Sequence, residues 1–226
     1  LNYRNHWSDK HKLFCPRHDS PAKFSCPNEV DSYFPFSSQY VEDNAQVYSY
    51  YVPHDVPGLI ALNGGNESFV KRLELFAERT FDDTWTGLPN PFIWIGNEPS
   101  LLIPWLFNFA GRADLTQKYT HRIANVFFTT GADGLPGNDD YGAISTWLLW
   151  SMIGLYPVSG SDVYIVGAPM FEQLDLQLGD TKTLSVRAHN FKSDGSSDVA
   201  MRAALNGAPL DMKRNAFVKH RDLIAN

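Results

Sequence analysis

Two neighbouring carboxylates, Asp139 and Asp140, stand where acid/base chemistry or a hard cation could be placed. They lie in the segment Gly131–Gly142, whose glycines and proline exclude a helix interior. Apolar segments flank this loop, residues 112–130 before it and 143–156 after it. The pair is therefore predicted at the mouth of a buried helix. The alternative is that one aspartate only caps that helix, because Asp is a preferred N-cap residue.

Two further acidic sites share this setting, Glu42 and the pair Asn97-Glu98. Each is predicted in a loop between apolar helices and is surrounded by aromatic residues. Aromatic faces stack on sugar rings, carboxylates hydrogen-bond hydroxyls, and a glycosidase needs two carboxyl groups flanking the glycosidic bond. A hard cation needs carboxylate and carbonyl oxygens. The alternatives are that Glu42 is a solvated loop acid and that Glu98 only favours the dipole of a first helical turn.

Composition excludes several classes of function. The 226 residues are 43% hydrophobic and 14% aromatic, so a sizeable core is available. The net charge of -6 argues against nucleic acid as a partner, and no run of 18 apolar residues predicts a membrane span. The seven histidines are scattered and offer no zinc site. The chain has no initiator Met and starts inside what reads as a structured segment, so we interpret it as a fragment of a longer protein.

The two cysteines, Cys15 and Cys26, leave the compartment open. They could close a short disulfide loop in an oxidising compartment, and two isolated thiols fit a reduced protein equally well. The glycosylation sequon Asn66-Glu67-Ser68 is weak evidence of secretion.

Hydrophobic periodicity predicts helices up to about residue 157. An amphipathic helix that begins at Asn66 or Ser68 carries one apolar stripe, made of Phe69, Val70, Leu73, Phe76 and Ala77. Further helical segments are predicted over Leu101–Ala110 and from Asp114 onward. The stretch Trp147–Leu155 is apolar on all sides, which predicts a helix surrounded by protein.

From about Val158 the period changes from 3.6 to 2. Leu174, Leu176 and Leu178 alternate with polar residues, and turns are predicted at Gly179-Asp180, Ser193-Asp194-Gly195 and Asn206-Gly207. This pattern is typical of an antiparallel sheet with one wet face. We therefore predict an α+β chain with a helical part over residues 1–157 and a β-rich part over residues 158–226.

Three segments together resemble glycoside hydrolase family 92, whose members are calcium-dependent exo-acting α-mannosidases. They are Glu42-Asp43-Asn44-Ala45 with Tyr48-Ser49 and Val52-Pro53-His54-Asp55; Gly96-Asn97-Glu98-Pro99-Ser100; and Asp133–Asp140 with Gly142, Trp147 and Gly154–Pro157. Their order and spacing agree with the family. The resemblance implies that residues 1–157 form part of an (α/α)6 helical barrel, and that residues 158–226 return to a β-sandwich.

The resemblance also implies roles for single residues. Glu42 would be the general acid, and Asp140, with Asp139 beside it, the general base. Because the family inverts configuration, the two carboxyl groups should lie about 6.5–9.5 Å apart to leave room for a water molecule. The metal ligands to Ca²⁺ would be Asn97 and Glu98.

The substrate implied by the resemblance is a mannose-containing glycan in the extracellular space or secretory pathway, such as an N-glycan undergoing processing. It would be contacted by His54, Asp55 and Asn138. The alternative for His54-Asp55 is a structural hydrogen-bonded pair.

The chain departs from the family pattern at several positions. Asp43 stands where Gly is usual, Leu102 where His is often found, and Phe92-Ile93 where α-1,2-specific members carry a polar pair. The linkage is therefore left open. The alternatives to an active enzyme are a non-catalytic glycan-binding protein of the same fold and an inactive fragment. The sequence does not set the oligomeric state.

Overall fold

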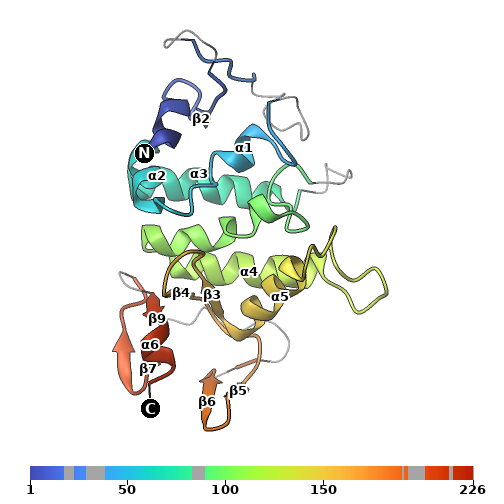
Figure 1. Ribbon diagram of the computed structural model, residues 1–226, viewed down its shortest axis with the longest axis vertical. Helices are drawn as coiled ribbons and strands as arrows, with labels where there is room; N and C mark the ends of the chain where they lie inside the picture. Colours follow the sequence, from blue (N-terminus) through green and yellow to red (C-terminus); the bar gives the residue numbers. More distant parts are fainter. Residues whose placement is uncertain are drawn as a thin grey trace. The chain divides into compact units, whose positions relative to one another are not determined.

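The computed structural model describes residues 1–17, 23–28, 39–82, 90–189, 191–192, 202–213 and 216–225. It divides into two compact units, Leu1–Pro104 and Trp105–Asn226. After one short N-terminal hairpin, helices occupy the chain up to Ile153 and antiparallel strands follow (Figure 1), which confirms the predicted mixture of helices and antiparallel strands. No helix among the described residues is long and apolar enough to cross a membrane.

The first unit, Leu1–Pro104, contains short elements around one long helix. They are η1 (Asn2–His6), β1 (Trp7–Ser8), β2 (Leu13–Phe14), α1 (Ala45–Tyr48), α2 (Val56–Leu62), α3 (Asn66–Arg79) and η3 (Glu98–Ser100). Strands β1 and β2 form an antiparallel hairpin. Directly after β2, Cys15 is joined to Cys26 by a disulfide, which was one of the two alternatives left open by the sequence.

Helix α3 buries the predicted apolar stripe. Phe69, Leu73 and Ala77 have no exposed surface. The ring of Tyr50 packs against Phe69 and Phe76, with ring centroids 6.1 and 5.3 Å apart. The 3.6-residue period therefore identified the face that makes the core of this unit.

Helix α2 begins at Val56 and has Pro57 in its first turn. Asp55 is its N-cap, and one carboxylate oxygen accepts a hydrogen bond from the Gly58 amide at 3.0 Å. The other oxygen accepts from the Tyr3 hydroxyl at 2.6 Å and from the Arg4 guanidinium at 3.3 Å. One carboxylate thus starts α2 and ties it to η1.

The second unit, Trp105–Asn226, carries the remaining elements. They are most of η4 (Ile103–Ala110), then α4 (Ala113–Phe127), α5 (Ala143–Ile153), β3 (Leu155–Pro157), β4 (Val163–Val166), β5 (Gln173–Leu178), β6 (Lys182–Arg187), β7 (Ala203–Leu205), β8 (Ala208–Leu210), β9 (Phe217–Lys219) and α6 (His220–Leu223). Both segments predicted as helices before the acidic loop are helical, the first as a 3₁₀ helix.

Helix α5 is the apolar segment that follows the acidic loop. Ile144, Trp147 and Ile153 are buried, whereas Leu149 is 54% exposed. The prediction of a helix surrounded on all sides is therefore met on one side only, within the part of the chain that the structure describes. Gly154 ends the helix at φ 81°, where a Cβ would press against the backbone of Ala168 and Pro169.

The strands pair as the period of two predicts. A three-stranded antiparallel sheet has the order β3-β4-β9, and β5-β6 and β7-β8 are hairpins. Leu174 lies opposite Val186 and Leu176 opposite Leu184, which places these side chains on one face. Asn206-Gly207 joins β7 to β8 with φ values of 50° and 80°, as a type I′ turn requires. The turn predicted at residues 193–195 lies outside the described residues.

We expect Gly58→Ala to destabilise the protein, although Ala normally favours a helix over Gly by about 1 kcal/mol. A Cβ at residue 58 would collide with the Asp55 carboxylate, the Tyr3 hydroxyl and the Arg4 guanidinium. The expected loss is on the order of 1–3 kcal/mol in the free energy of unfolding, measured by chemical denaturation. Ala61→Gly, at an exposed position of the same helix, reports helix propensity alone. A Gly58→Ala protein more stable than the wild type would contradict the steric argument.

Candidate active site

Glu42 is exposed in the turn that precedes α1, and its backbone is left-handed with φ 66°. This conformation costs a non-glycine residue roughly 1–3 kcal/mol, so the surrounding structure must hold it. The Tyr48 hydroxyl donates to the carbonyl oxygen of Val41 at 2.5 Å, and the Asn97 side chain donates to the carbonyl oxygen of Glu42 at 2.7 Å. The two peptide groups that flank Glu42 are therefore both anchored.

Asn44 fixes the other end of this turn. Its side-chain oxygen caps α1 by accepting from the Val47 amide at 3.0 Å, and its side-chain nitrogen donates to the Pro91 carbonyl at 2.9 Å. Asn44 is fully buried, so these bonds replace those it would make with water.

Asp43, between Glu42 and Asn44, is a buried carboxyl group with 4% of its surface exposed. Burial raises its pKa to about 7, although the hydrogen bond from the Asn44 amide at 2.8 Å acts in the opposite direction. Burial, and then the charges of Asp43 and Glu42, also raise the pKa of the Tyr48 hydroxyl. In the sequence, Asp43 stood out only as a departure from the family pattern, and Tyr48 only as part of a motif.

Asn97 and Glu98 lie together at the start of η3. The Asn97 side-chain oxygen accepts from the Glu98 amide at 3.2 Å, while its nitrogen makes the bond to Glu42. Both residues are partly exposed. One side-chain amide therefore connects the predicted metal segment to the predicted acid.

The donor set of this segment suits a hard cation in kind. An amide oxygen from Asn97 and a carboxylate from Glu98 are ligands that calcium prefers, but calcium takes about 6–8 oxygens. Among the described residues, no group of three His, Cys, Asp or Glu side chains gathers into a metal site. These two residues thus fit calcium chemically and would supply only part of its coordination shell.

His54 and Asp55 lie at the start of α2. The hydrogen bond from Tyr3 lowers the pKa of Asp55, and the bonds from Gly58 and Arg4 act in the same direction. The His54 ring meets the Tyr3 ring edge-on with centroids 5.5 Å apart. Asp55 therefore has a structural role as cap and anchor, and a role of the pair in sugar binding stays a prediction.

Asp139 and Asp140, in the second unit, differ in their surroundings. The carboxylate of Asp139 accepts from the Ser145 amide at 2.7 Å and from the Ser145 hydroxyl at 3.0 Å, so it binds the first turn of α5. Asp140 is exposed, and its backbone is left-handed with φ 37°. Asn138 is exposed as well. The capping alternative thus describes Asp139 and leaves the Asp140 carboxylate facing solvent.

The structure brings together Glu42 and Asn97-Glu98 within the unit Leu1–Pro104, and Asn138, Asp139 and Asp140 within the unit Trp105–Asn226. The convergence of Glu42 with Asp140 across one sugar stays a prediction.

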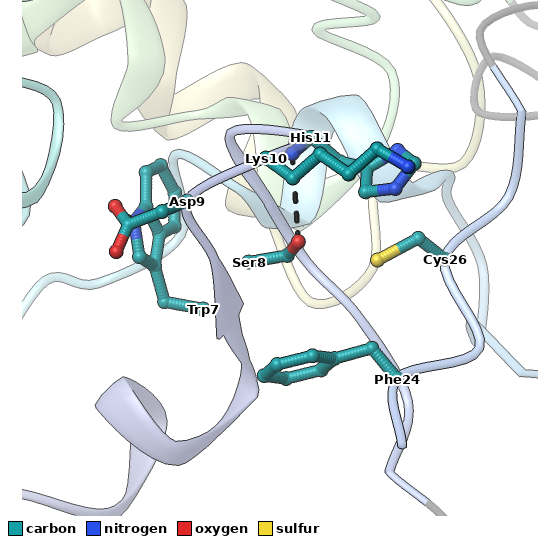
Figure 2. Close-up of a pocket in the computed structure, with 7 residues that line it drawn as sticks. All are labelled: Trp7, Ser8, Asp9, Lys10, His11, Phe24 and Cys26. Carbon is teal, nitrogen blue, oxygen red and sulfur yellow. Dashed lines mark hydrogen bonds between the residues drawn. The ribbon is translucent and has the colours of Figure 1, made fainter. Parts of the chain in front are cut away.

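A hollow of about 490 Å³ lies beside the β1–β2 hairpin (Figure 2). Residues 7–11 of the hairpin line it together with Phe24 and Cys26, and the Ser8 hydroxyl accepts from the His11 amide at 3.4 Å. None of the predicted site residues contributes to its lining. The hollow is therefore separate from the acidic turn at Glu42.

The buried carboxyl of Asp43 makes stability depend on pH. Its pKa is about 7 in the folded protein and ordinarily 3.8, so between these values the unfolded chain releases a proton that the folded chain keeps. Stability should therefore fall as pH rises from about 4 to about 7 and then level off. Asp43→Asn keeps an oxygen for the Asn44 amide and removes the charge.

We expect Asp43→Asn to be more stable than the wild type at pH 8, by a few kcal/mol at most, and equal to it near pH 4. Differential scanning calorimetry at both pH values measures this difference. Asp133→Asn, at an exposed position of the acidic loop, is the matched control. An Asp43→Asn protein with the same pH dependence as the wild type would show that Asp43 is not the titrating group.

Comparison with known proteins gives a consistent result. The model of the glycosyl hydrolase family 92 catalytic domain matches residues 1–226. An uncharacterized secreted glycosidase of Arthroderma benhamiae is 37% identical over 159 residues, which cover 70% of this chain and 19% of that protein.

Solved structures agree with this match. A family GH92 α-mannosidase of Bacteroides thetaiotaomicron in complex with mannoimidazole has a TM-score of 0.85 at 26% identity, covering 99% of this chain and 30% of its own. A family GH92 inverting mannosidase of the same organism has a TM-score of 0.78 at 24% identity, covering 99% of this chain and 31% of its own, and supports the fold alone. The chain thus spans a fifth to a third of the length of these relatives, and it belongs to the glycosyl hydrolase family 92 catalytic domain.

Proposed function

We propose that this chain forms part of an exo-acting, inverting α-mannosidase that hydrolyses terminal α-mannosides of glycans with the help of calcium. The observation that carries the proposal is the family match over residues 1–226, combined with the three acidic segments in the order typical of the family. The similarity to an α-mannosidase whose structure is in complex with mannoimidazole supports mannose as the sugar.

Glu42 is the general acid in this proposal. Its carboxyl group would donate a proton to the glycosidic oxygen while the bond from that oxygen to the sugar C1 breaks. The anchored turn around Glu42 supports this role, because a proton donor must be held within hydrogen-bond reach of the oxygen it protonates.

Asp140 is the general base. Its carboxylate would take a proton from a water molecule whose oxygen attacks C1 from the face opposite the leaving group, which gives the inverted sugar. The hydrogen bonds of Asp139 to Ser145 support the choice of Asp140, because they occupy both oxygens of the neighbouring carboxylate. Exchange of protons with solvent would then return both groups to their starting states.

Asn97 and Glu98 would hold calcium through the side-chain amide oxygen and the carboxylate. When bound there, the ion supplies a fixed positive charge that attracts sugar hydroxyls and favours distortion of the ring. His54, Asp55 and Asn138 would contact the substrate.

The cellular setting that we propose is the extracellular space or secretory pathway, with N-glycans among the substrates. The disulfide between Cys15 and Cys26 supports it, because disulfides persist in oxidising compartments. The similarity to a secreted glycosidase points the same way.

We expect the complete protein to hydrolyse an aryl α-mannoside and to lose most of that activity when a chelator removes calcium. The release of the aryl alcohol is followed by absorbance, and added calcium should restore it. The aryl β-mannoside is the control substrate. Activity that ignores the chelator would contradict the calcium assignment, and mannoside binding by calorimetry without turnover would favour a glycan-binding protein of the same fold.

Replacing each aspartate of the pair should separate the two roles. Asp140→Asn, which tolerates the left-handed backbone, should lower kcat by about 10²–10⁴ without changing the unfolding temperature. Asp139→Ala should lower the free energy of unfolding by about 0.5–2 kcal/mol, because Ser145 loses its partner. If Asp139→Ala removed turnover while Asp140→Asn did not, the base would be Asp139.

A further inference from the structure

We propose that Tyr48 and the side-chain amide of Asn97 form a clamp that sets the direction of the Glu42 side chain. They are thus positioning residues for proton donation. The inference rests on the proposed role of Glu42 as general acid. It adds Tyr48 to the residues that serve the reaction, through its hydrogen bond beside Glu42. It also gives Asn97 a second task besides binding calcium.

The argument begins with the geometry of one residue. The φ and ψ angles of a residue relate two rigid peptide planes, and they set the direction in which its Cα–Cβ bond leaves the backbone, from which the side chain then extends. The plane before Glu42 contains the Val41 carbonyl, which accepts from Tyr48 at 2.5 Å. The plane after Glu42 contains its own carbonyl, which accepts from Asn97 at 2.7 Å. Holding both planes fixes φ and ψ together.

The conformation that the clamp holds is one that Glu42 would not adopt unaided. At φ 66° the Cβ of an L-residue crowds the following carbonyl, so a free turn would relax to an extended or right-handed backbone. Relaxation would turn the side chain to a different direction. The two hydrogen bonds therefore affect the position of the Glu42 carboxyl group as well as the stability of the turn.

Tyr48 is itself well placed as a donor. It is the last residue of α1, and its ring contacts Tyr40 and Tyr51 with centroids 6.1 and 6.2 Å apart. Burial and the neighbouring carboxylates raise the pKa of its hydroxyl, so the group keeps its proton over the physiological range. The ring contacts limit the positions that the hydroxyl can take.

The test compares Tyr48→Phe with Tyr51→Phe in the complete protein. The first removes the donor to Val41, and the second removes a hydroxyl from the neighbouring ring, which is 45% exposed. The substrates are two aryl α-mannosides: the dinitrophenyl mannoside, whose aglycone leaves without protonation, and the unsubstituted phenyl mannoside, whose weakly acidic aglycone needs protonation to leave. Glu42→Gln is the reference for loss of the acid.

We expect Tyr48→Phe to lower kcat about tenfold or more on the poor leaving group, with KM changed less than about twofold and little loss on the dinitrophenyl substrate. Tyr51→Phe should behave as the wild type. In the Glu42→Gln background, Tyr48→Phe should cause no further loss of kcat, because there is no acid left for Tyr48 to position. Equal loss of Tyr48→Phe on both substrates would indicate a merely structural role and would overturn the clamp.

Asn97→Asp is the second variant, since it keeps the oxygen for Glu98 and calcium and loses the donor to Glu42. At saturating calcium it should show the same dependence on the leaving group, and equal loss on both substrates would overturn its part in the clamp. The outcomes separate the two proposals. If Glu42→Gln shows no dependence on the leaving group, the acid assignment fails; if it does while Tyr48→Phe matches Tyr51→Phe, only the clamp fails.

Discussion

The feature on which the candidate site of the first unit depends is the side-chain amide of Asn97. Its oxygen accepts from the Glu98 backbone and its nitrogen donates to the Glu42 carbonyl, 55 residues earlier in the chain. An amide is suited to this because it presents an acceptor and donors in one rigid plane. One side chain thereby joins two segments that the sequence shows only as separate acidic motifs.

Both carboxylates proposed for catalysis stand at left-handed backbone positions, Glu42 at φ 66° and Asp140 at φ 37°. Strain of this kind persists only where neighbours hold it, and it is concentrated at functional sites. At Glu42 the neighbours are identified, since Tyr48 and Asn97 anchor the flanking peptide groups. At Asp140, the preceding Asp139 is bound to Ser145 and fixes the start of the loop's last turn. Near each proposed catalytic residue, another side chain thus makes hydrogen bonds that hold the backbone of its turn.

Periodicity predicted the elements better than the site. Stripes such as Phe69, Leu73 and Phe76 and the alternation of β5 with β6 arise from burial, which one-dimensional patterns record directly. Periodicity could not distinguish Asp139 from Asp140, because both precede an apolar helix and only the path of the backbone decides which one reaches Ser145. It could not identify Tyr48 either. A tyrosine between Val47 and Ser49 has the same pattern whether its hydroxyl faces water or a carbonyl.

The disulfide between Cys15 and Cys26 is linked to the turn of Glu42 by a short series of contacts in the first unit. Cys15 packs with Leu13 and Ala45, so the hairpin lies on α1. The Ser49 hydroxyl accepts from the Phe14 amide at 3.0 Å, which joins β2 to the residue after Tyr48. Tyr48 in turn anchors the turn of Glu42. Because α1 is only four residues long and cannot be stable alone, its position must come from these contacts. The oxidised hairpin is therefore part of what holds the proposed acid, and not only a covalent link at the start of the chain.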